Sequence, residues 1–281
     1  LCDLGVVQAA AILREAGHQP NVIDALAQQE SDLAETRTGY VALGTPLDVF
    51  TMGVKEAVLG THVVVVAMTP FNRPPKRDPY LAASIEAIKE AAPDLPIVLA
   101  DLYQSGQHYI HVDPQAILDA YPEVSVWLQY EAEADLVAVC ESLIEQPRAP
   151  AQVVLGTAPL ELDRLAFPAW DLVDLDAKAT FLSKVVSKLG RSEWEFPLVG
   201  RTLPMLTSRG CPYTCTHCSS NPDVKPGAKK TQRRYSAAYL RRYLGHLKAA
   251  YGVDRVFILD EMLNVNQSHF DDVLGILSEL E

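Results

Sequence analysis

Three cysteines crowded into one short segment are the residues of this chain whose types and spacing could do chemistry. Cys211 and Cys215 are separated by three residues, and Cys215 and Cys218 by two. Their thiolates can therefore surround one compact metal centre. Soft sulfur ligands favour iron–sulfur clusters, zinc or copper(I) over hard cations. A four-iron cluster normally takes four cysteines, so three would leave one iron open to a bidentate small molecule.

Two other interpretations of the cysteines remain open at this point. Zinc could be held by the three thiolates with His217 or a distant fourth ligand, as in a structural zinc site. However, the adjacent His217 and Cys218 would have difficulty binding the same tetrahedral ion. A redox dithiol formed by Cys215 and Cys218 would leave Cys211 unexplained.

The segment around the cysteines resembles a known family. Residues 208–218 read SRGCPYTCTHC, and their Cys-x3-Cys-x2-Cys pattern is similar to that of radical S-adenosylmethionine (radical SAM) enzymes. The SRGCPYxC portion looks like that of a cobalamin-associated branch of the family. The resemblance implies a redox-active 4Fe-4S cluster whose fourth iron is chelated by S-adenosylmethionine. One electron from the cluster would then split the sulfonium to a 5′-deoxyadenosyl radical.

The same resemblance implies further residues around S-adenosylmethionine. Tyr213 and His217 lie in the cysteine segment, with His217 where the family usually has an aromatic residue beside the adenine. The stretch Tyr251–Glu261 resembles the second barrel strand with its acidic end. Asp260 or Glu261 could thus bind the ammonium of S-adenosylmethionine through a charge-assisted contact. A strand-end cap or a solvated acid is the competing interpretation of this pair.

Apolar runs alternate with helical spacing along the chain, which predicts an α/β fold. Continuous apolar strands of this kind indicate a parallel sheet covered on both faces. In the first half we expect helices at 6–16, 46–59, 79–91, 114–120 and 131–144, and strands at 21–24, 62–67, 97–100 and 124–128. In the last third we expect strands at 203–207 and 255–259 and helices at 237–249 and 268–280.

The first half also resembles a cobalamin-binding domain, through Leu4-Gly5 and the segments 12–18, 22–24 and 131–136. Parallel sheets bind ligands at the carboxyl ends of their strands. The residues assigned to a cobalamin edge are Thr69, Tyr103, Ser105 and Gly106. Small residues let a corrin approach the backbone closely, and the chain departs from the family at two such places. Ala100-Asp101 replaces an expected Gly-Gly pair, and Tyr130 replaces a glycine.

The predicted organisation has two domains. Residues 1–150 form a doubly wound parallel-sheet (Rossmann-like, cobalamin-binding-like) domain, whose first strand in the family would precede Leu1. The stretch from Pro147 onward is punctuated by prolines, and we expect residues 151–201 to form an inter-domain linker. These prolines are Pro147, Pro150, Pro159, Pro168 and Pro197. Residues 202–281 form the first βα units of a radical SAM partial TIM barrel. We expect both ends of the chain to be cut and the fragment alone to be inactive.

Composition restricts the possible partners. A net charge of -12 argues against broad nucleic-acid binding, although residues 229–234 form a short basic segment. No apolar run is long enough to span a membrane, and five cysteines are too few for a disulfide scaffold. Clustered thiols suggest a reducing compartment, so we expect a cytoplasmic protein. Cys140 and Cys2 are expected to pack in apolar surroundings.

The function that the resemblance implies is reductive cleavage of S-adenosylmethionine, followed by cobalamin-dependent methyl transfer or a radical rearrangement. A flavodoxin or ferredoxin would supply the electron, and the small-molecule or peptide substrate is unknown. One alternative is a radical SAM enzyme whose Rossmann-like domain no longer binds cobalamin. The other is a zinc-stabilised non-catalytic binding module.

Overall fold

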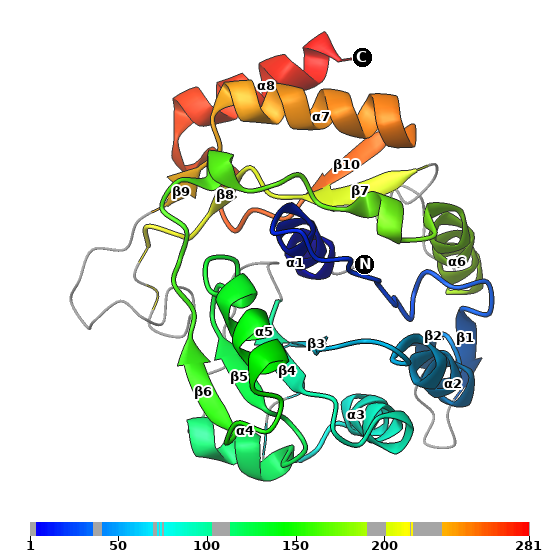
Figure 1. Ribbon diagram of the computed structural model, residues 1–281. Coiled ribbons are helices and arrows are strands. Elements are labelled where there is room, and N and C mark those ends of the chain that lie inside the picture. Colours follow the sequence, from blue (N-terminus) through cyan, green and yellow to red (C-terminus); the bar gives the residue numbers. More distant parts are fainter. Residues whose placement is uncertain are drawn as a thin grey trace.

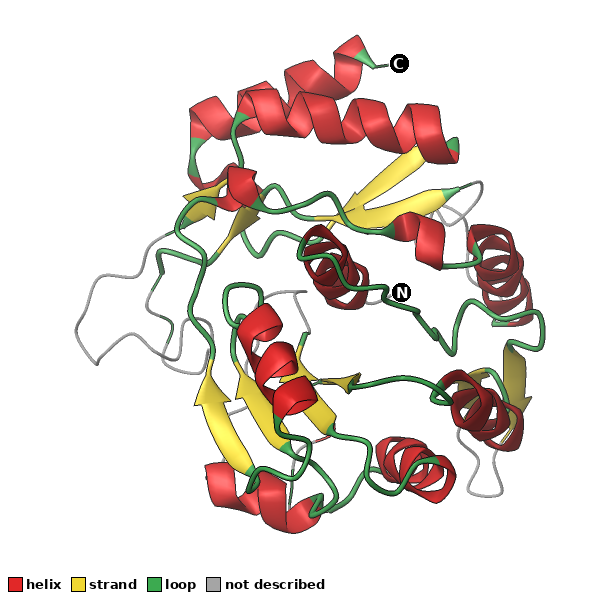
Figure 2. Cartoon of the chain, in the orientation of Figure 1, coloured by secondary structure: helices red, strands yellow, loops and turns green. Residues whose placement is uncertain are grey.

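The computed structural model describes residues 4–35, 41–69, 72, 74, 76–102, 113–189, 201–213, 215 and 232–280. Across these residues the fold is α/β, as predicted (Figures 1 and 2). Four parallel strands make the main sheet, in the order β3-β4-β5-β6. They are β3 (Val64–Met68), β4 (Ile97–Asp101), β5 (Val126–Gln129) and β6 (Gln152–Leu155).

Helices cover both faces of this sheet, which agrees with the expected Rossmann-like arrangement. One apolar cluster joins β3, β4 and β5 to helices on one face, and a second joins them to helices on the other. On the first face are α2 (Leu47–Ala57), α3 (Pro79–Ala91) and α4 (Pro114–Ala120). On the second face are α1 (Leu4–Glu15) and α5 (Leu136–Glu145).

Two of these helices begin where their first residues dictate. Asp78 caps α3 by accepting hydrogen bonds from the backbone N–H groups of Tyr80 and Leu81, and Pro79 takes the first helical position. Asp113 and Pro114 repeat this arrangement at α4. Proline is preorganised for the first helical turn because its missing N–H has no partner there anyway.

The remaining helices and strands form the upper part of the molecule in Figure 1 and a side hairpin. Strands β7 (Thr202–Met205) and β10 (Arg255–Ile258) pair in parallel, with Thr202 opposite Arg255. Helix α7 (Ala237–Tyr251) connects them through the chain and contacts α8 (Gln267–Glu279). Two antiparallel pairs complete the strands: β1 (Asp32–Glu35) with β2 (Val41–Gly44), and β8 (Ser208–Arg209) with β9 (Arg233–Arg234).

Helix α1 lies between the main sheet and the β7–β10 pair (Figure 1). Its Ala9 packs with the main sheet and α5, whereas Leu4 and Val7 pack with β7, α7 and α8. The contact with the end of β4 is close, because a Cβ added at Gly5 would lie 1.8 Å from the carbonyl oxygen of Leu102. One helix therefore belongs to the apolar cores of both parts of the chain.

Several predicted boundaries are wrong. Residues 21–24 form no strand, because the Asp24 carboxylate accepts a hydrogen bond from the Leu26 N–H and turns the chain. Helix α5 begins at Leu136 rather than residue 131. Strand β6 extends the main sheet beyond the predicted boundary at residue 150.

The predicted linker contains a further helix, α6 (Leu175–Lys188), which Asp174 caps. It also contains three-residue 3₁₀ turns, η3 (Leu162–Arg164) and η4 (Trp170–Leu172), and a third such turn, η5 (Leu263–Val265), precedes α8. Trp170 is completely buried, and its indole N–H donates to the Tyr243 hydroxyl at 3.1 Å. The segment 151–201 is thus partly folded structure rather than a plain connection.

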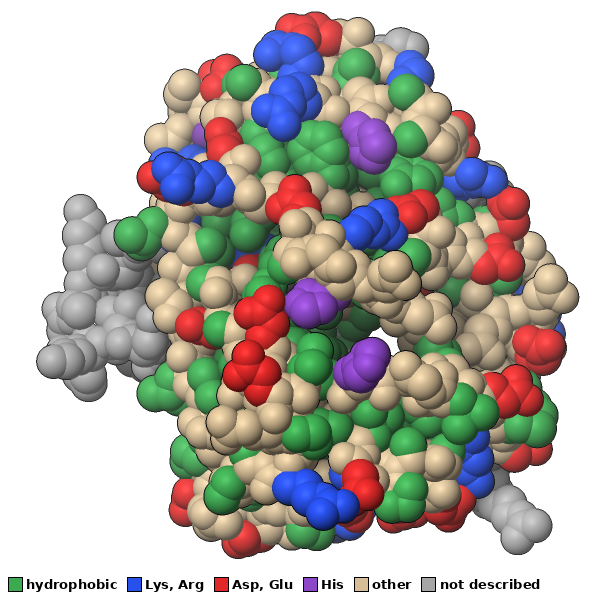
Figure 3. All heavy atoms as spheres, viewed as in Figure 1, with side chains coloured by type: hydrophobic (Ala, Val, Ile, Leu, Met, Phe, Trp, Pro, Cys, Tyr) green, Lys and Arg blue, Asp and Glu red, His purple; other side chains and the backbone are tan. Residues whose placement is uncertain are grey.

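Figure 3 shows the charged side chains on one face of the molecule. In Figure 3 acidic and basic side chains are interspersed on the visible face, which shows no broad basic area. None of the helices in the described ranges combines the length and the apolar character needed to cross a bilayer.

Candidate functional site

The cysteine segment leaves the carboxyl end of β7, where the two parallel strands of the upper part end side by side. Thr207, Ser208 and Arg209 follow β7 and are all buried. Gly210 comes next with φ 88°, a conformation that favours glycine. Cys211 is half-buried, whereas Tyr213 and Cys215 are exposed. The segment therefore runs from the protein interior to its surface within a few residues.

Asp260 holds the start of this segment. Its Oδ1 accepts a hydrogen bond from the Thr207 backbone N–H at 2.7 Å, and its Oδ2 accepts one from the Thr207 hydroxyl at 2.6 Å. The Ser208 hydroxyl also donates to Oδ2. Burial raises the pKa of Asp260, and the hydrogen bonds from Ser208 and Thr207 offset only part of that rise. The carboxylate at the end of β10 thus fixes the loop after β7.

His269, in the first turn of α8, extends this network. Its Nε2 lies 2.9 Å from the Thr207 hydroxyl oxygen. Because the hydroxyl proton is donated to Asp260, His269 must donate from Nε2, which defines its tautomer. Burial lowers the pKa of His269, so the neutral ring is favoured. The side-chain amide of Gln232 also donates to Ser208 Oγ at 3.0 Å and to the Met262 carbonyl at 2.9 Å.

Arg209 connects the cysteine segment to the main sheet. Its Nη1 donates to Glu131 at 3.0 Å and lies 2.6 Å from a carboxylate oxygen of Glu133. Arg233 of β9 binds the same Glu131 carboxylate. Both glutamates follow the carboxyl end of β5, the predicted ligand edge of the sheet. This edge therefore contacts the strand residues that precede Cys211.

Besides Cys211, Tyr213 and Cys215, the sequence-predicted site residues separate into three groups. Asp260 and Glu261 follow β10, with Asp260 engaged with Thr207 and Ser208 and Glu261 half-buried. Thr69 follows β3, where its backbone N–H and its hydroxyl both donate to the Asn72 carboxamide oxygen at 2.9 Å. The following predicted residues lie outside the described ranges: Tyr103, Ser105, Gly106, His217 and Cys218.

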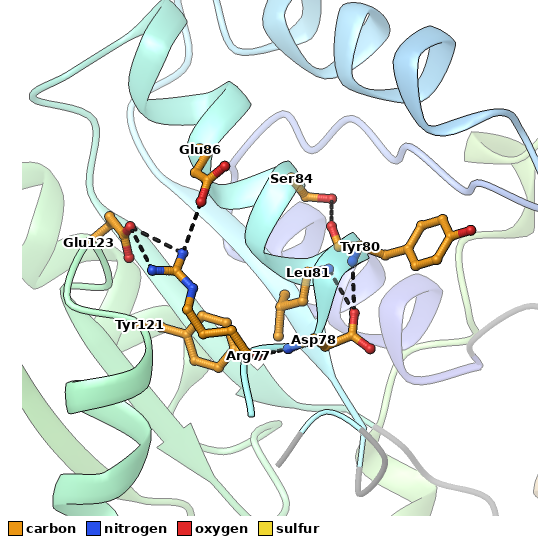
Figure 4. A network of polar contacts seen from close by, with 8 residues as sticks. All are labelled: Arg77, Asp78, Tyr80, Leu81, Ser84, Glu86, Tyr121 and Glu123. Carbon is orange, nitrogen blue, oxygen red and sulfur yellow. Dashed lines mark hydrogen bonds and ion pairs between the residues drawn. The ribbon is translucent and has the colours of Figure 1, made fainter. Parts of the chain in front are cut away.

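The loop after β3 is anchored at its far end (Figure 4). Arg77 donates to Glu123 at 3.2 Å, and its guanidinium lies 5.3 Å from the centroid of the Tyr121 ring. The Asp78 backbone N–H donates to the Tyr121 hydroxyl at 3.0 Å. This hydroxyl donates in turn to the Asn72 carbonyl at 3.3 Å, so the anchor reaches back toward Thr69.

No family model matches this chain, and no curated protein matches it.

The positions of the cysteines are relevant to the predicted metal centre. Among the described residues, no three or more His, Cys, Asp or Glu side chains gather in a way that could hold a metal ion. Two of the three predicted ligands, Cys211 and Cys215, fall within those residues. Cys140 differs from both because it packs in the main-sheet core, as expected, and burial raises its pKa to about 11. Cys140 is therefore a structural thiol that does not ionise near neutral pH.

The sequence interpretation missed the roles of Arg209, Glu131 and Glu133. A signal was present, because Glu131 and Glu133 directly follow an apolar strand and Arg209 precedes Cys211. Tyr130, at a position where the resemblance leads us to expect glycine, has φ 69° and so adopts a left-handed conformation that glycine takes readily.

Proposed function

We propose that the chain carries the metal-binding part of a radical SAM enzyme, with Cys211, Cys215 and Cys218 as ligands of a 4Fe-4S cluster. The observation that carries this proposal is the position of the cysteine segment at the carboxyl end of a parallel β7-α7-β10 unit. Active sites of βα-built folds gather at this edge. When bound, the cluster would supply the electron that cleaves S-adenosylmethionine.

The donor set suits such a cluster. Thiolates are the ligands that iron–sulfur clusters take. Cys211 is half-buried and Cys215 is exposed, so both lie where the segment reaches the protein surface. Asp260 holds the base of this segment through Thr207 and Ser208. We assign Asp260 a positioning role and leave Glu261 as the acidic residue proposed to bind the ammonium of S-adenosylmethionine.

We further propose that the main sheet is a cobalamin-binding domain, which would make the reaction methyl transfer or a radical rearrangement. Two observations support this. Thr69 follows β3 and the turn with Glu131 follows β5, at the edge where parallel sheets take ligands. Glu131 and Glu133 also bind Arg209, so this edge adjoins the cysteine segment.

Metal analysis after anaerobic reconstitution with iron and sulfide tests the cluster. Optical and electron paramagnetic resonance spectra should show a 4Fe-4S cluster, and Cys211→Ala, Cys215→Ala or Cys218→Ala should each abolish its signal. Cys140→Ala is the matched control, because this thiol packs in the core, and it should retain the cluster. Retention of the signal in all three ligand variants would defeat the assignment.

The same samples separate the two alternative functions. Stoichiometric zinc together with refusal of iron would favour a zinc-stabilised binding module. Cobalamin is tested by adding hydroxocobalamin and looking for a corrin spectrum that co-elutes with the folded protein. Absence of the corrin from a cluster-containing protein would favour a radical SAM enzyme whose Rossmann-like domain serves as a scaffold.

A further inference from the structure

Four charged side chains meet where the main sheet contacts the cysteine segment. Arg209 lies within 3.0 Å of Glu131 and 2.6 Å of Glu133, while Arg233 binds Glu131 with both Nη atoms. Arg233 also donates to the Pro159 carbonyl at 2.6 Å. The four residues come from the turn after β5 and from the short strands β8 and β9. We call these four residues the junction.

Three of the four junction residues are buried, Arg233 is half-buried, and the formal charges of the four side chains balance. The exposed fractions of Arg209, Glu131 and Glu133 are only 2%, 9% and 7%. Two carboxylates face two guanidinium groups, so the formal charges cancel. Burial alone would favour the neutral form of Glu131, yet Arg209 and Arg233 outweigh burial and lower its pKa. Apolar residues of similar volume would often stabilise such a site equally well. A buried ion cluster is therefore better explained by a role in fixing the relative position of the two segments that it joins.

The backbone that presents the glutamates is held in place from both sides. Tyr130, directly before Glu131, keeps φ at 69° despite its side chain. On the neighbouring segment, the Gly156 N–H donates to the Gln129 carbonyl at 2.8 Å. A Cβ added at Gly156 would lie 2.2 Å from the Glu131 carbonyl oxygen, so only glycine permits this approach. The turn after β5 therefore has little freedom to move.

We propose that Glu131 and Glu133 are positioning residues that act through Arg209 to place Cys211 against the ligand edge of the main sheet. Arg209 precedes Cys211 by two residues, with only Gly210 between them. Because the chain between them is so short, fixing the Arg209 side chain also restricts where the Cys211 thiol can lie. The importance of this placement for metal binding rests on the proposed function, but the placement itself does not.

Alkylation of the metal-free chain tests the placement directly. Glu133→Gln keeps the side-chain volume and removes one charge that faces Arg209. We expect iodoacetamide to modify Cys211 at least about threefold faster in this variant, because local opening of the segment becomes more frequent. The rate at the already exposed Cys215 should not change. Peptide mass spectrometry follows each cysteine separately.

Two controls distinguish positioning from general loosening. Glu123→Gln removes another carboxylate that binds an arginine, Arg77, next to α4 at the far end of the main sheet from β8 (Figure 1). It should leave the Cys211 rate unchanged. The buried Cys140 reports opening of the core, and its rate should stay at the wild-type value in Glu133→Gln.

The outcomes decide the inference as follows. Unchanged Cys211 alkylation in a folded protein with both Glu131→Gln and Glu133→Gln would overturn it, as would equal acceleration at Cys211 and Cys140. If the glutamine variants do not fold, Glu133→Asp, which retains the charge but shortens the side chain, should itself be alkylated faster than wild type at Cys211, and an unchanged rate in this variant would overturn the inference. Iron uptake by wild type and Glu133→Gln is measured in parallel. Wild type that binds no iron would refute the metal centre, while the alkylation rates would still decide the positioning role.

Discussion

Tyr130 is the one described non-glycine residue with a positive φ, and it directly precedes the two glutamates of the junction. A left-handed conformation costs an L-residue with a Cβ about 1–2 kcal/mol. Such strain persists only where the surroundings impose it, and it concentrates at functional sites. Because it adjoins the junction, this strain identifies the turn after β5 as more than a connection.

Replacement of Tyr130 separates the backbone strain from the loss of the ring. Tyr130→Ala removes the ring but keeps the Cβ, whereas Tyr130→Gly removes both. We expect the glycine variant to exceed the alanine variant in free energy of unfolding by about 1 kcal/mol, since only glycine relieves the strain. Urea unfolding of the two variants measures this difference. Equal stabilities would mean that the turn is not strained by its side chain.

Two carboxylates of the site should give the protein opposite responses to pH. The pKa of Glu131 is held below its ordinary value of 4.5 by Arg209 and Arg233, which outweigh burial. Its stabilising contribution is therefore present above pH 4.5 and is lost as the pH falls through the folded-state pKa. Burial raises the pKa of Asp260 above 3.8, so its contribution favours folding at low pH and is lost as the pH rises through the folded-state pKa.

Glu131→Gln should therefore weaken the loss of stability on acidification, and Asp260→Asn should strengthen it. Urea midpoints measured in steps from pH 7 to about pH 3.5 give the two slopes, which are compared with the wild type. Because both variants lose buried hydrogen bonds, the slope against pH, rather than the stability at one pH, is the diagnostic quantity. Slopes that change in the same direction would contradict the electrostatic description of the site.

Strand β6 and helix α6 show where interpretation of the sequence failed. Residues 152–155 are one glutamine and three apolar residues in a stretch punctuated by prolines, a pattern that predicts a linker, yet they pair with β5 along their length. The predicted bounds of helices α3 and α4 agree with the structure, in which an aspartate cap and a proline mark the start of each helix. Local signals thus define single elements, whereas membership of a sheet depends on partners far along the chain.

The same distinction applies to the candidate site. The cysteine spacing is local, and it was readable from the sequence. The contact between Glu131 and Arg209 joins residues 78 positions apart, and the contact between Thr207 and Asp260 joins residues 53 positions apart. Such long-range pairs depend on how the two parts of the chain are placed. For this reason Asp260 was predicted as a ligand residue, while its contacts to Thr207 and Ser208 could not be predicted.

The close approach of Gly156 to the β5 turn predicts opposite effects of the same substitution at two glycines. Gly156→Ala places a Cβ against the Glu131 and Gln129 carbonyl oxygens, and overpacking of this kind costs about 1–3 kcal/mol. Gly275→Ala, on the exposed side of α8 with nothing within 4 Å of the new Cβ, should instead stabilise by about 0.5–1 kcal/mol. Thermal unfolding measures both. A Gly156→Ala protein as stable as wild type would show that the turn is free to shift.

At the scale of the molecule, two structural features connect the predicted domains, residues 1–150 and 202–281. Helix α1 contributes Ala9 to the core of the main sheet and Leu4 and Val7 to the core beneath α7 and α8. The junction adds a buried ion cluster between the same two parts. Domains that share a helix and a buried charged interface should not unfold independently.

Two tryptophans report on the two cores separately. Trp127 lies in the main-sheet core and Trp170 in the core of the upper part, and both are completely buried. With Trp194→Phe as background, Trp127→Phe and Trp170→Phe each leave a single reporter. Urea unfolding of each protein is followed by fluorescence and by circular dichroism. We expect the two methods to give the same midpoint within experimental error for both proteins. A tryptophan signal that changes well before the circular dichroism would show that the two parts unfold as separate units, and that α1 and the junction do not couple them.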